Sequence, residues 1–238
     1  MLKRLALCTS TCLLMAAQAG ANEFAEFPLI FGGTYIASDS TYSYLGIVHP
    51  DWGGELGRGW YQSAIVNYLT YEYTTAVDAV NTRVKAKAPG VDIGLGYIWS
   101  GTDYSLNLSG SVGYRNFDLS PDLPNEEPNG GEAAFTPQVI ASYEINPAFK
   151  VDLISNFSIG PDSTYNRLRG GYVAHGWRLG PEFVYQDGEN YRNSQIGIFT
   201  EIPLTGGFRI ELSVGQLENQ DDDNGGYISL GFSKVRWN

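Results

Sequence analysis

The stretch FRIELSVG, Phe208–Gly215, shows the residue pattern that decides the fold. Apolar side chains alternate with polar or small ones at every step. The first set is Phe208, Ile210, Leu212 and Val214, and the second is Arg209, Glu211, Ser213 and Gly215. Successive side chains of a β-strand point to opposite faces. The stretch therefore predicts a strand with one apolar face and one polar face.

The same period of two recurs along the chain after residue 21. No later window shows a helical apolar stripe or 18 consecutive apolar residues, so helical membrane spans are not expected. A tilted strand needs about 9–11 residues to cross a membrane. We predict twelve strands, at 28–37, 41–48, 60–73, 82–99, 102–117, 133–145, 149–160, 165–174, 177–187, 191–202, 207–218 and 226–237.

Composition agrees with an all-β protein that is not an ordinary soluble domain. Charged residues are only 17% of the 238 residues, against about a quarter in soluble domains. The chain has 29 Gly and 16 Tyr, as β-structure favours aromatic residues and its turns favour glycine. Lys and Arg total 15 against 26 Asp and Glu, a net charge of -11. This balance disfavours nucleic acid as a partner, because such binding relies on clustered cations.

The first 21 residues have the pattern of a secretory signal peptide. Lys3 and Arg4 precede the apolar run 5–17, and Ala17-Gln18-Ala19 or 19–21 fits the cleavage pattern. The alternative, a transmembrane anchor, is disfavoured because the run is too short to span a bilayer. We expect a signal peptide at 1–21 and a single β-barrel domain at 22–238. The two cysteines lie inside the signal, so disulfides are not expected in the exported chain.

The predicted connections suggest how the strands are arranged. Short turns at 100–101, 146–147, 175–176 and 205–206 alternate with longer acidic connections at 118–132 and 218–225. Outer-membrane barrels have an even strand number, short periplasmic turns and longer external loops. The pattern predicts an antiparallel up-and-down transmembrane β-barrel of about twelve strands in the bacterial outer membrane, with lipid as its partner. The glycine-rich connection 49–59 is long for the periplasmic side that this parity assigns to it.

Tryptophans provide a second indication of a membrane. In the predicted topology Trp60, Trp99, Trp177 and Trp237 lie at the periplasmic rim, and Trp52 lies in a periplasmic connection. Aromatic girdles of this kind mark membrane interfaces. A soluble β-sandwich is the alternative fold. In the last strand Trp237 falls on the opposite parity from Ile228, which predicts a bulge.

The polar faces of the later strands carry charges of both signs. Strands that follow one another in a meander are neighbours, so these side chains can meet on one wall of the lumen. Arginine and carboxylate groups in a poorly solvated lumen are expected to pair, and a network of this kind fills the interior of a medium-sized barrel. The predicted network is Arg167, Arg169, Arg178, Glu182, Glu201, Arg209 and Glu211.

Catalytic chemistry is poorly supported. There is no G-x-S-x-G motif, and the two histidines, His49 and His175, fall in a connection and a turn. Glutamates such as Glu182 and Glu201 could form a glycosidase pair, but four arginines lie nearby and favour ion pairing. We expect no enzymatic activity.

An acidic stretch near the C-terminus suggests calcium binding at first reading. Asp221-Asp222-Asp223 resembles the start of an EF-hand loop, but the twelfth position is Phe232 instead of Glu. A solvated acidic loop is the better interpretation, and no metal or cofactor is expected.

Several short blocks of the chain, in order, carry a resemblance to a known family. The blocks are Phe31-Gly32-Gly33, 40–46, Gly113-Tyr114-Arg115, 119–121, 162–165, 167–172, Gly180-Pro181-Glu182 and Tyr191-Arg192. With them the chain resembles BcsS-type cellulose biosynthesis proteins, a family of small outer-membrane β-barrels, over nearly all of its mature length. The resemblance implies a role in cellulose production or export, with cellulose or components of its secretion as partners, and it supplies no catalytic residues.

Three functions therefore remain open on the sequence. The first is a non-enzymatic barrel that assists production of an exopolysaccharide, with cellulose as the expected polymer. The second is an outer-membrane pore for small solutes, and the third is a barrel-embedded hydrolase. A pore predicts a clear lumen with separated Arg and Glu, whereas a plugged scaffold predicts that these charges pair. The sequence does not define the oligomeric state.

Overall fold

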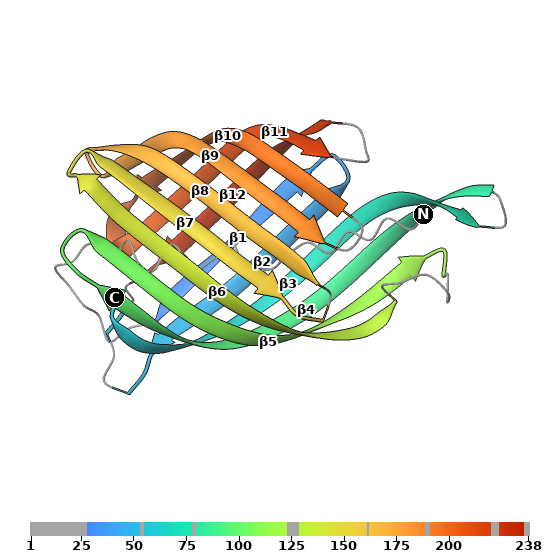
Figure 1. Cartoon of the computed structure of the whole chain (residues 1–238), viewed down its shortest axis with the longest axis horizontal. Coiled ribbons are helices and arrows are strands. Elements are labelled where there is room, and N and C mark those ends of the chain that lie inside the picture. The colour runs from blue at the N-terminus through green and yellow to red at the C-terminus, as the bar shows by residue number, and fades with distance from the viewer. Residues whose placement is uncertain are drawn as a thin grey trace.

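The computed structural model describes residues 28–52, 55–77, 80–122, 129–160, 162–188, 191–219 and 224–235. In these residues twelve antiparallel strands close into one barrel, in which β1 pairs with β12 (Figure 1). No helix in the described part is long and apolar enough to cross a membrane. The signal segment, Trp237 and Asp221-Asp222-Asp223 lie outside the described residues.

The strand order confirms the predicted up-and-down meander, since every strand pairs with its neighbours in sequence. The predicted bounds differ from the observed ones by a few residues. The strands are β1 Leu29–Ala37, β2 Ser40–Pro50, β3 Gly59–Val77, β4 Val80–Ser100, β5 Tyr104–Ser120, β6 Gly130–Asn146, β7 Phe149–Ser158, β8 Ser163–Ala174, β9 Trp177–Gly188, β10 Tyr191–Pro203, β11 Phe208–Asn219 and β12 Gly225–Lys234.

The two ends of the barrel differ, and we name them by their connections. The turn end holds the start of β1, the end of β12 and the connections that follow β2, β4, β6, β8 and β10. The loop end holds the other connections. At the turn end, His175 and Gly176 both have positive φ, at 53° and 80°. This is the geometry of a two-residue hairpin that matches the twist of its strands.

One expectation at the strand ends is wrong: His49 lies in β2 and not in a connection. β12 ends at Lys234, and its pairing with β11 and β1 continues to that residue without a bulge. Trp237, on which the expected bulge rests, lies outside the described residues. From the third strand onward the connection lengths alternate only in part, since β9 ends at Gly188 and β10 already begins at Tyr191 at the loop end.

The strands differ in length, and this difference separates the two ends of the barrel more clearly than the connection lengths do. β3 to β6 have 17–21 residues, whereas β7 to β12 have 10–13. The long strands project beyond the rest of the barrel at the loop end (Figure 1).

The outward faces form an apolar band. Residues that point outward in the middle of the strands, such as Ile93, Leu108 and Leu212, are 59%, 42% and 39% exposed. The inward residues of the same strands are polar: Asn107 and Ser213 are buried. This apolar-out, polar-in alternation is that of a membrane barrel and confirms the predicted assignment of the two faces.

The band ends where the long strands project. On β3 and β4 the outward row changes from Val66 and Val91 to Glu72, Arg83 and Lys85. Lys85 lies 2.8 Å from Glu72, and Arg83 also forms an ion pair with it. These contacts, of which the Lys85 hydrogen bond has the largest effect, lower the pKa of Glu72. Such charges belong in water, so the tip of the β3–β4 hairpin lies beyond the hydrocarbon region.

Candidate functional site

The lumen holds the charged side chains that the sequence places on the inner faces of β8 to β11. Arg169 is opposite Glu182 in the register of β8 and β9, and Glu201 is opposite Arg178 in that of β9 and β10. Cross-strand partners of opposite charge support each other. Glu211, however, is directly opposite Glu201, so this pair of like charges requires cations nearby.

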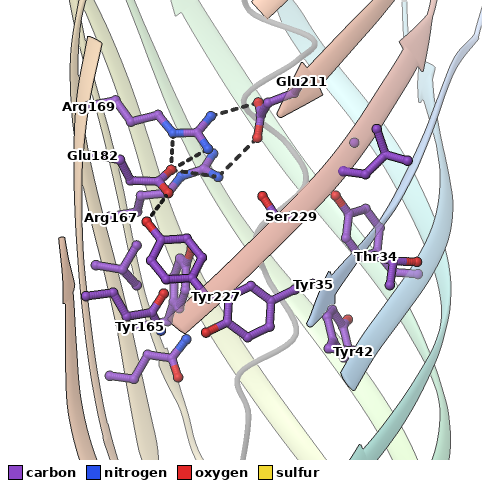
Figure 2. A pocket seen from close by; sticks show the side chains of 16 residues that line it. Thr34, Tyr35, Tyr42, Tyr165, Arg167, Arg169, Glu182, Glu211, Tyr227 and Ser229 are labelled. Atoms are coloured by element: carbon purple, nitrogen blue, oxygen red, sulfur yellow. Dashed lines mark hydrogen bonds and ion pairs between the residues drawn. The ribbon is translucent and has the colours of Figure 1, made fainter. Parts of the chain in front are cut away.

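Arg169 is at the centre of the ion pairs. Its Nε and Nη2 contact Glu182, its Nη1 lies 2.7 Å from Oε2 of Glu211, and its Nη2 donates to Ser213 Oγ at 3.0 Å. Its side chain is 2% exposed. Nearby, Nη1 of Arg167 lies 3.6 Å from Glu211 and 4.0 Å from Glu182. These two arginines neutralise the two carboxylates that face them (Figure 2).

Arg178 connects three strands on the turn-end side of this group. Its Nη1 contacts Asp152 on β7 and lies 3.3 Å from Oε1 of Glu201 on β10. To reach Asp152 from β9 the side chain must pass over β8, where Gly171 leaves room for it. A Cβ at Gly171 would lie 2.6 Å from Nε of Arg178.

Asp152 belongs to the same network of ion pairs but is absent from the set predicted on the sequence. It is 1% exposed and also accepts a hydrogen bond of 2.7 Å from Ser142. The alternation of side chains along β7 puts Asp152 on the inner face, and this alternation is the sequence feature that could have identified it. With Asp152 the network contains four arginines and four carboxylates. We call it the arginine–carboxylate cluster: Asp152, Arg167, Arg169, Arg178, Glu182, Glu201, Arg209 and Glu211.

Two further contacts hold the cluster in place. The Phe199 ring lies between two guanidinium groups, 4.6 Å from Cζ of Arg169 and 4.9 Å from that of Arg178. Tyr227 on β12 donates to Oε1 of Glu182 at 2.9 Å. Arg209 is the least buried member, with a side chain 26% exposed and Nη1 3.5 Å from Glu201. Because the arginines are occupied by carboxylates, the cluster is a filled part of the lumen and not a row of separated charges.

Apolar side chains fill the lumen next to the cluster. One contiguous group includes Phe31 on β1, Ile98 on β4, Ile154 on β7 and Val184 on β9. Leu56, from the connection between β2 and β3, belongs to the same group and is 5% exposed. The long connection at the turn end thus inserts a leucine into the barrel interior.

Backbone hydrogen bonds fix this connection. Glu55 and Arg58 bond to each other in both directions at 2.8 Å, and Ser100 Oγ donates to the carbonyl of Gly57 at 2.9 Å. Gly57 has a φ of 90°, which favours glycine. Part of the connection expected at 49–59 is therefore a cap over the turn end.

The tryptophans at the turn end point outward. Trp60, Trp99 and Trp177 are 42–53% exposed. Trp60 packs against Trp52 and Tyr97, with ring centroids 5.9 Å and 5.2 Å apart, and Tyr97 packs against Trp99 at 4.5 Å. This outward aromatic row stands where an interface girdle would be.

A pocket opens on the loop-end side of the cluster. It is lined by tyrosines, amides and the cluster residues Arg167, Arg169, Glu182 and Glu211, and it is partly open to solvent (Figure 2). Among the described residues no group of three His, Cys, Asp or Glu could hold a metal ion.

The family model "Cellulose biosynthesis protein BcsS" matches residues 29–236 of the chain. No curated protein sequence matches it.

Solved structures with the same fold are outer-membrane barrels. The chain is similar to the KdgM porin, with a TM-score of 0.58, 10% identity, and coverage of 88% of this chain and 99% of the porin. It is similar to the COG4313 outer membrane channel from Pseudomonas putida F1, with a TM-score of 0.56, 11% identity and coverage of 91% and 99%. The translocator domain of autotransporter NalP from Neisseria meningitidis gives a TM-score of 0.57, 8% identity and coverage of 90% of each chain. These likenesses show the fold.

Proposed function

The chain belongs to the BcsS family of cellulose biosynthesis proteins, and we propose that it is an outer-membrane barrel, without catalytic activity, that assists the production or export of cellulose at the cell surface. The family match over residues 29–236 is the observation that carries this proposal. The chain is exported after removal of residues 1–21, and its barrel inserts with the turn end toward the periplasm.

The outward apolar band and the aromatic row at the turn end support the location. A lipid environment stabilises the exposed apolar side chains, and Trp60, Trp99 and Trp177 form the girdle at one interface.

The filled lumen supports a scaffold over an open pore. The arginine–carboxylate cluster pairs its charges across β7 to β11, and Leu56 caps the turn end from within. The cluster fixes the shape of the interior, while the loop end presents a pocket to the outside.

A pore for small solutes is the second candidate, because porins and channels share the fold. One of them is described as a complex with disordered oligogalacturonate, an anionic polymer. In the present chain the lumen arginines are paired with carboxylates, which favours a neutral polymer.

The test is a strain that lacks the protein. We expect less cellulose in the deletion strain, measured by dye binding and by the glucose that purified cellulase releases. A plasmid copy of the wild-type chain should restore the amount. Unchanged cellulose in the deletion strain would contradict the proposal.

Conductance distinguishes the scaffold from the pore. The purified barrel in a planar bilayer should show little current. A large, steady ohmic current with the wild-type chain would favour the pore.

A further inference from the structure

Four tyrosines surround the lumen at the loop end. We call them the tyrosine collar: Tyr35 on β1, Tyr42 on β2, Tyr165 on β8 and Tyr227 on β12. Each is two residues from the loop-end terminus of its strand, and all four line the pocket above the arginine–carboxylate cluster. At about 3.3 Å per residue they lie roughly 7 Å inside the strand ends.

Three of the four collar rings stack on a neighbouring tyrosine. Tyr35 stacks with Tyr227, and Tyr42 stacks with Tyr44, each with centroids 5.7 Å apart. The Tyr227 ring rests on the backbone of β10 and β11, because a Cβ at Gly197 or Gly215 would lie 2.4 Å or 2.6 Å from it. Figure 2 shows rings of the collar beside the ion pairs of the cluster.

Amide side chains lie beside the collar, where Gln186 is opposite Tyr165 in the register of β8 and β9. Gln186 and Gln195 line the pocket. Asn193 joins them, since it donates to Gln186 at 3.2 Å and accepts from Gln195 at 3.3 Å. Amides both donate and accept, and so match hydroxyl groups, which do the same.

The amide of Asn156 is buried near the collar. Neither its oxygen nor its nitrogen has a hydrogen-bond partner among the described residues, although the side chain is 4% exposed. Asn156 is opposite Tyr165, which lines the pocket. Buried polar groups without partners are rare and call for an explanation, and a hydroxyl-rich ligand beside Tyr165 would supply one.

Two buried tyrosines follow outward from the collar, Tyr71 at 2% and Tyr73 at 7% exposed. Tyr42 pairs in register with Leu69 on β3, and the next inward residues of β3, Tyr71 and Tyr73, stack with centroids 5.8 Å apart. These side chains belong to one cluster with Tyr42. β3 projects beyond the barrel at the loop end (Figure 1), so the aromatic row leads from the tip of the hairpin to the pocket.

The charges of the pocket are balanced. Arg167 and Arg169 pair with Glu182 and Glu211. No excess of either sign attracts an ion, and an anionic sugar would have to compete with these carboxylates for the arginines.

We infer that the collar and its amides form a binding site for the end of a linear, neutral glycan. The C–H faces of a pyranose ring stack on tyrosines, and its hydroxyls bond to the amides and to Tyr35. If the proposed function holds, as this inference assumes, the physiological ligand is a β-1,4-linked glucan.

Binding of cellohexaose to the mature barrel in detergent tests the site. Titration calorimetry should detect saturable binding, with tetragalacturonate bound at least tenfold more weakly. Tyr42→Ala and Gln195→Ala should each raise the Kd for cellohexaose about tenfold, which corresponds to about 1.4 kcal/mol. Tyr35→Phe, which removes only one hydroxyl, gives a milder version of the test in a barrel that should remain folded.

Tyr104→Ala is the matched control. Tyr104 is a tyrosine on the outer face, 54% exposed, at the turn end of β5, and its loss should leave the Kd unchanged. Heat-modifiable gel migration checks that every variant is folded. Folded Tyr42→Ala, Gln195→Ala and Tyr35→Phe barrels that bind as the wild type does would overturn the assignment, as would a wild-type barrel that binds no cellohexaose.

The deletion strain separates this inference from the proposed function. Reduced cellulose in that strain, with no oligosaccharide binding by the barrel, would remove the site and keep the function. Binding that Tyr42→Ala weakens, with unchanged cellulose in the deletion strain, would keep the site and remove the function.

Discussion

Glu182 should be the carboxylate whose loss destabilises the barrel most. It contacts Arg169 twice, accepts from Tyr227 at 2.9 Å and lies 4.0 Å from Arg167. In Glu182→Ala, Arg169 keeps Glu211 but loses its contact at Nε, and Tyr227 loses its acceptor. Removing one partner of a buried ion pair costs about 3–5 kcal/mol. We expect a fall of this size in the free energy of unfolding, a large share of the 5–15 kcal/mol of a typical protein.

The measurement is urea unfolding of the mature barrel in detergent micelles, followed by tryptophan fluorescence. Glu218→Ala is the control, because Glu218 is an exposed carboxylate near the end of β11. It should change the unfolding free energy by no more than about 0.5 kcal/mol. If the two variants unfold at the same urea concentration with equal slopes, the cluster does not stabilise the barrel as argued.

Glu201→Ala sharpens the comparison. Glu201 contacts Arg178, but Arg178 also keeps Asp152, and Glu201 is directly opposite the like charge of Glu211. Relief of that repulsion offsets part of the lost attraction. Glu201→Ala should therefore cost less than Glu182→Ala. The reverse order would show that the repulsion between Glu201 and Glu211 does not offset the lost ion pairs.

Three other perturbations test the membrane face, the turn-end cap and the collar. Leu212→Arg, in the outward band, should cost about 2–4 kcal/mol of barrel stability in liposomes, whereas Gln216→Arg, near the strand end on the same face, should cost about 0–1; equal costs would contradict the assigned depth. Leu56→Asp places a carboxylate in the apolar lumen cluster and should raise the planar-bilayer conductance above that of Trp52→Ala, an exposed change in the same connection; an unchanged current would show that Leu56 does not close the barrel. Gly215→Val should displace the Tyr227 ring that rests on Gly215 and weaken the hydrogen bond from Tyr227 to Glu182. The free energy of unfolding should therefore be lower in Gly215→Val than in the control Gly226→Val, where the nearest atom to an added Cβ is 3.6 Å away.

The fold could be predicted well from the sequence because each strand of a membrane barrel has a local pattern of alternating apolar and polar residues. A strand such as Phe208–Asn219 meets lipid on one face and a polar lumen on the other, so its alternation is unbroken. Strand count and order follow, since each short connection forces neighbours to pair. The strand ends were less predictable. β2 continues through His49 because the register with β3 continues to Pro50 and Tyr61, and that pairing is invisible in β2 alone.

The charge cluster was predictable only in part. Parity puts Arg169 and Glu182 on the inner face, and the meander makes their strands adjacent, so their meeting needs no further information. Asp152 required more. Its partner Arg178 lies two strands away, and the contact exists because Gly171 on the strand between them has no side chain. The residue pattern of a single strand therefore cannot predict the contact between Asp152 and Arg178, which depends on the missing side chain of a glycine in the strand between them.

The cap at the turn end shows the same limit for a connection. Gly-rich composition at 49–59 suggested an irregular segment, and its length was unusual for a periplasmic turn. The reversal at Gly57, held by Ser100, turns Leu56 into the barrel. A single apolar residue among glycines and charged residues shows no hydrophobic periodicity. Its burial follows from its position over the turn end of the barrel. With this end capped and the charges of the cluster paired, the pocket beside the collar is a part of the lumen that is partly open at the loop end. The interior is therefore asymmetric, capped at one end and hollowed at the other. That arrangement suits a protein that holds one end of a glycan better than one that lets solutes pass.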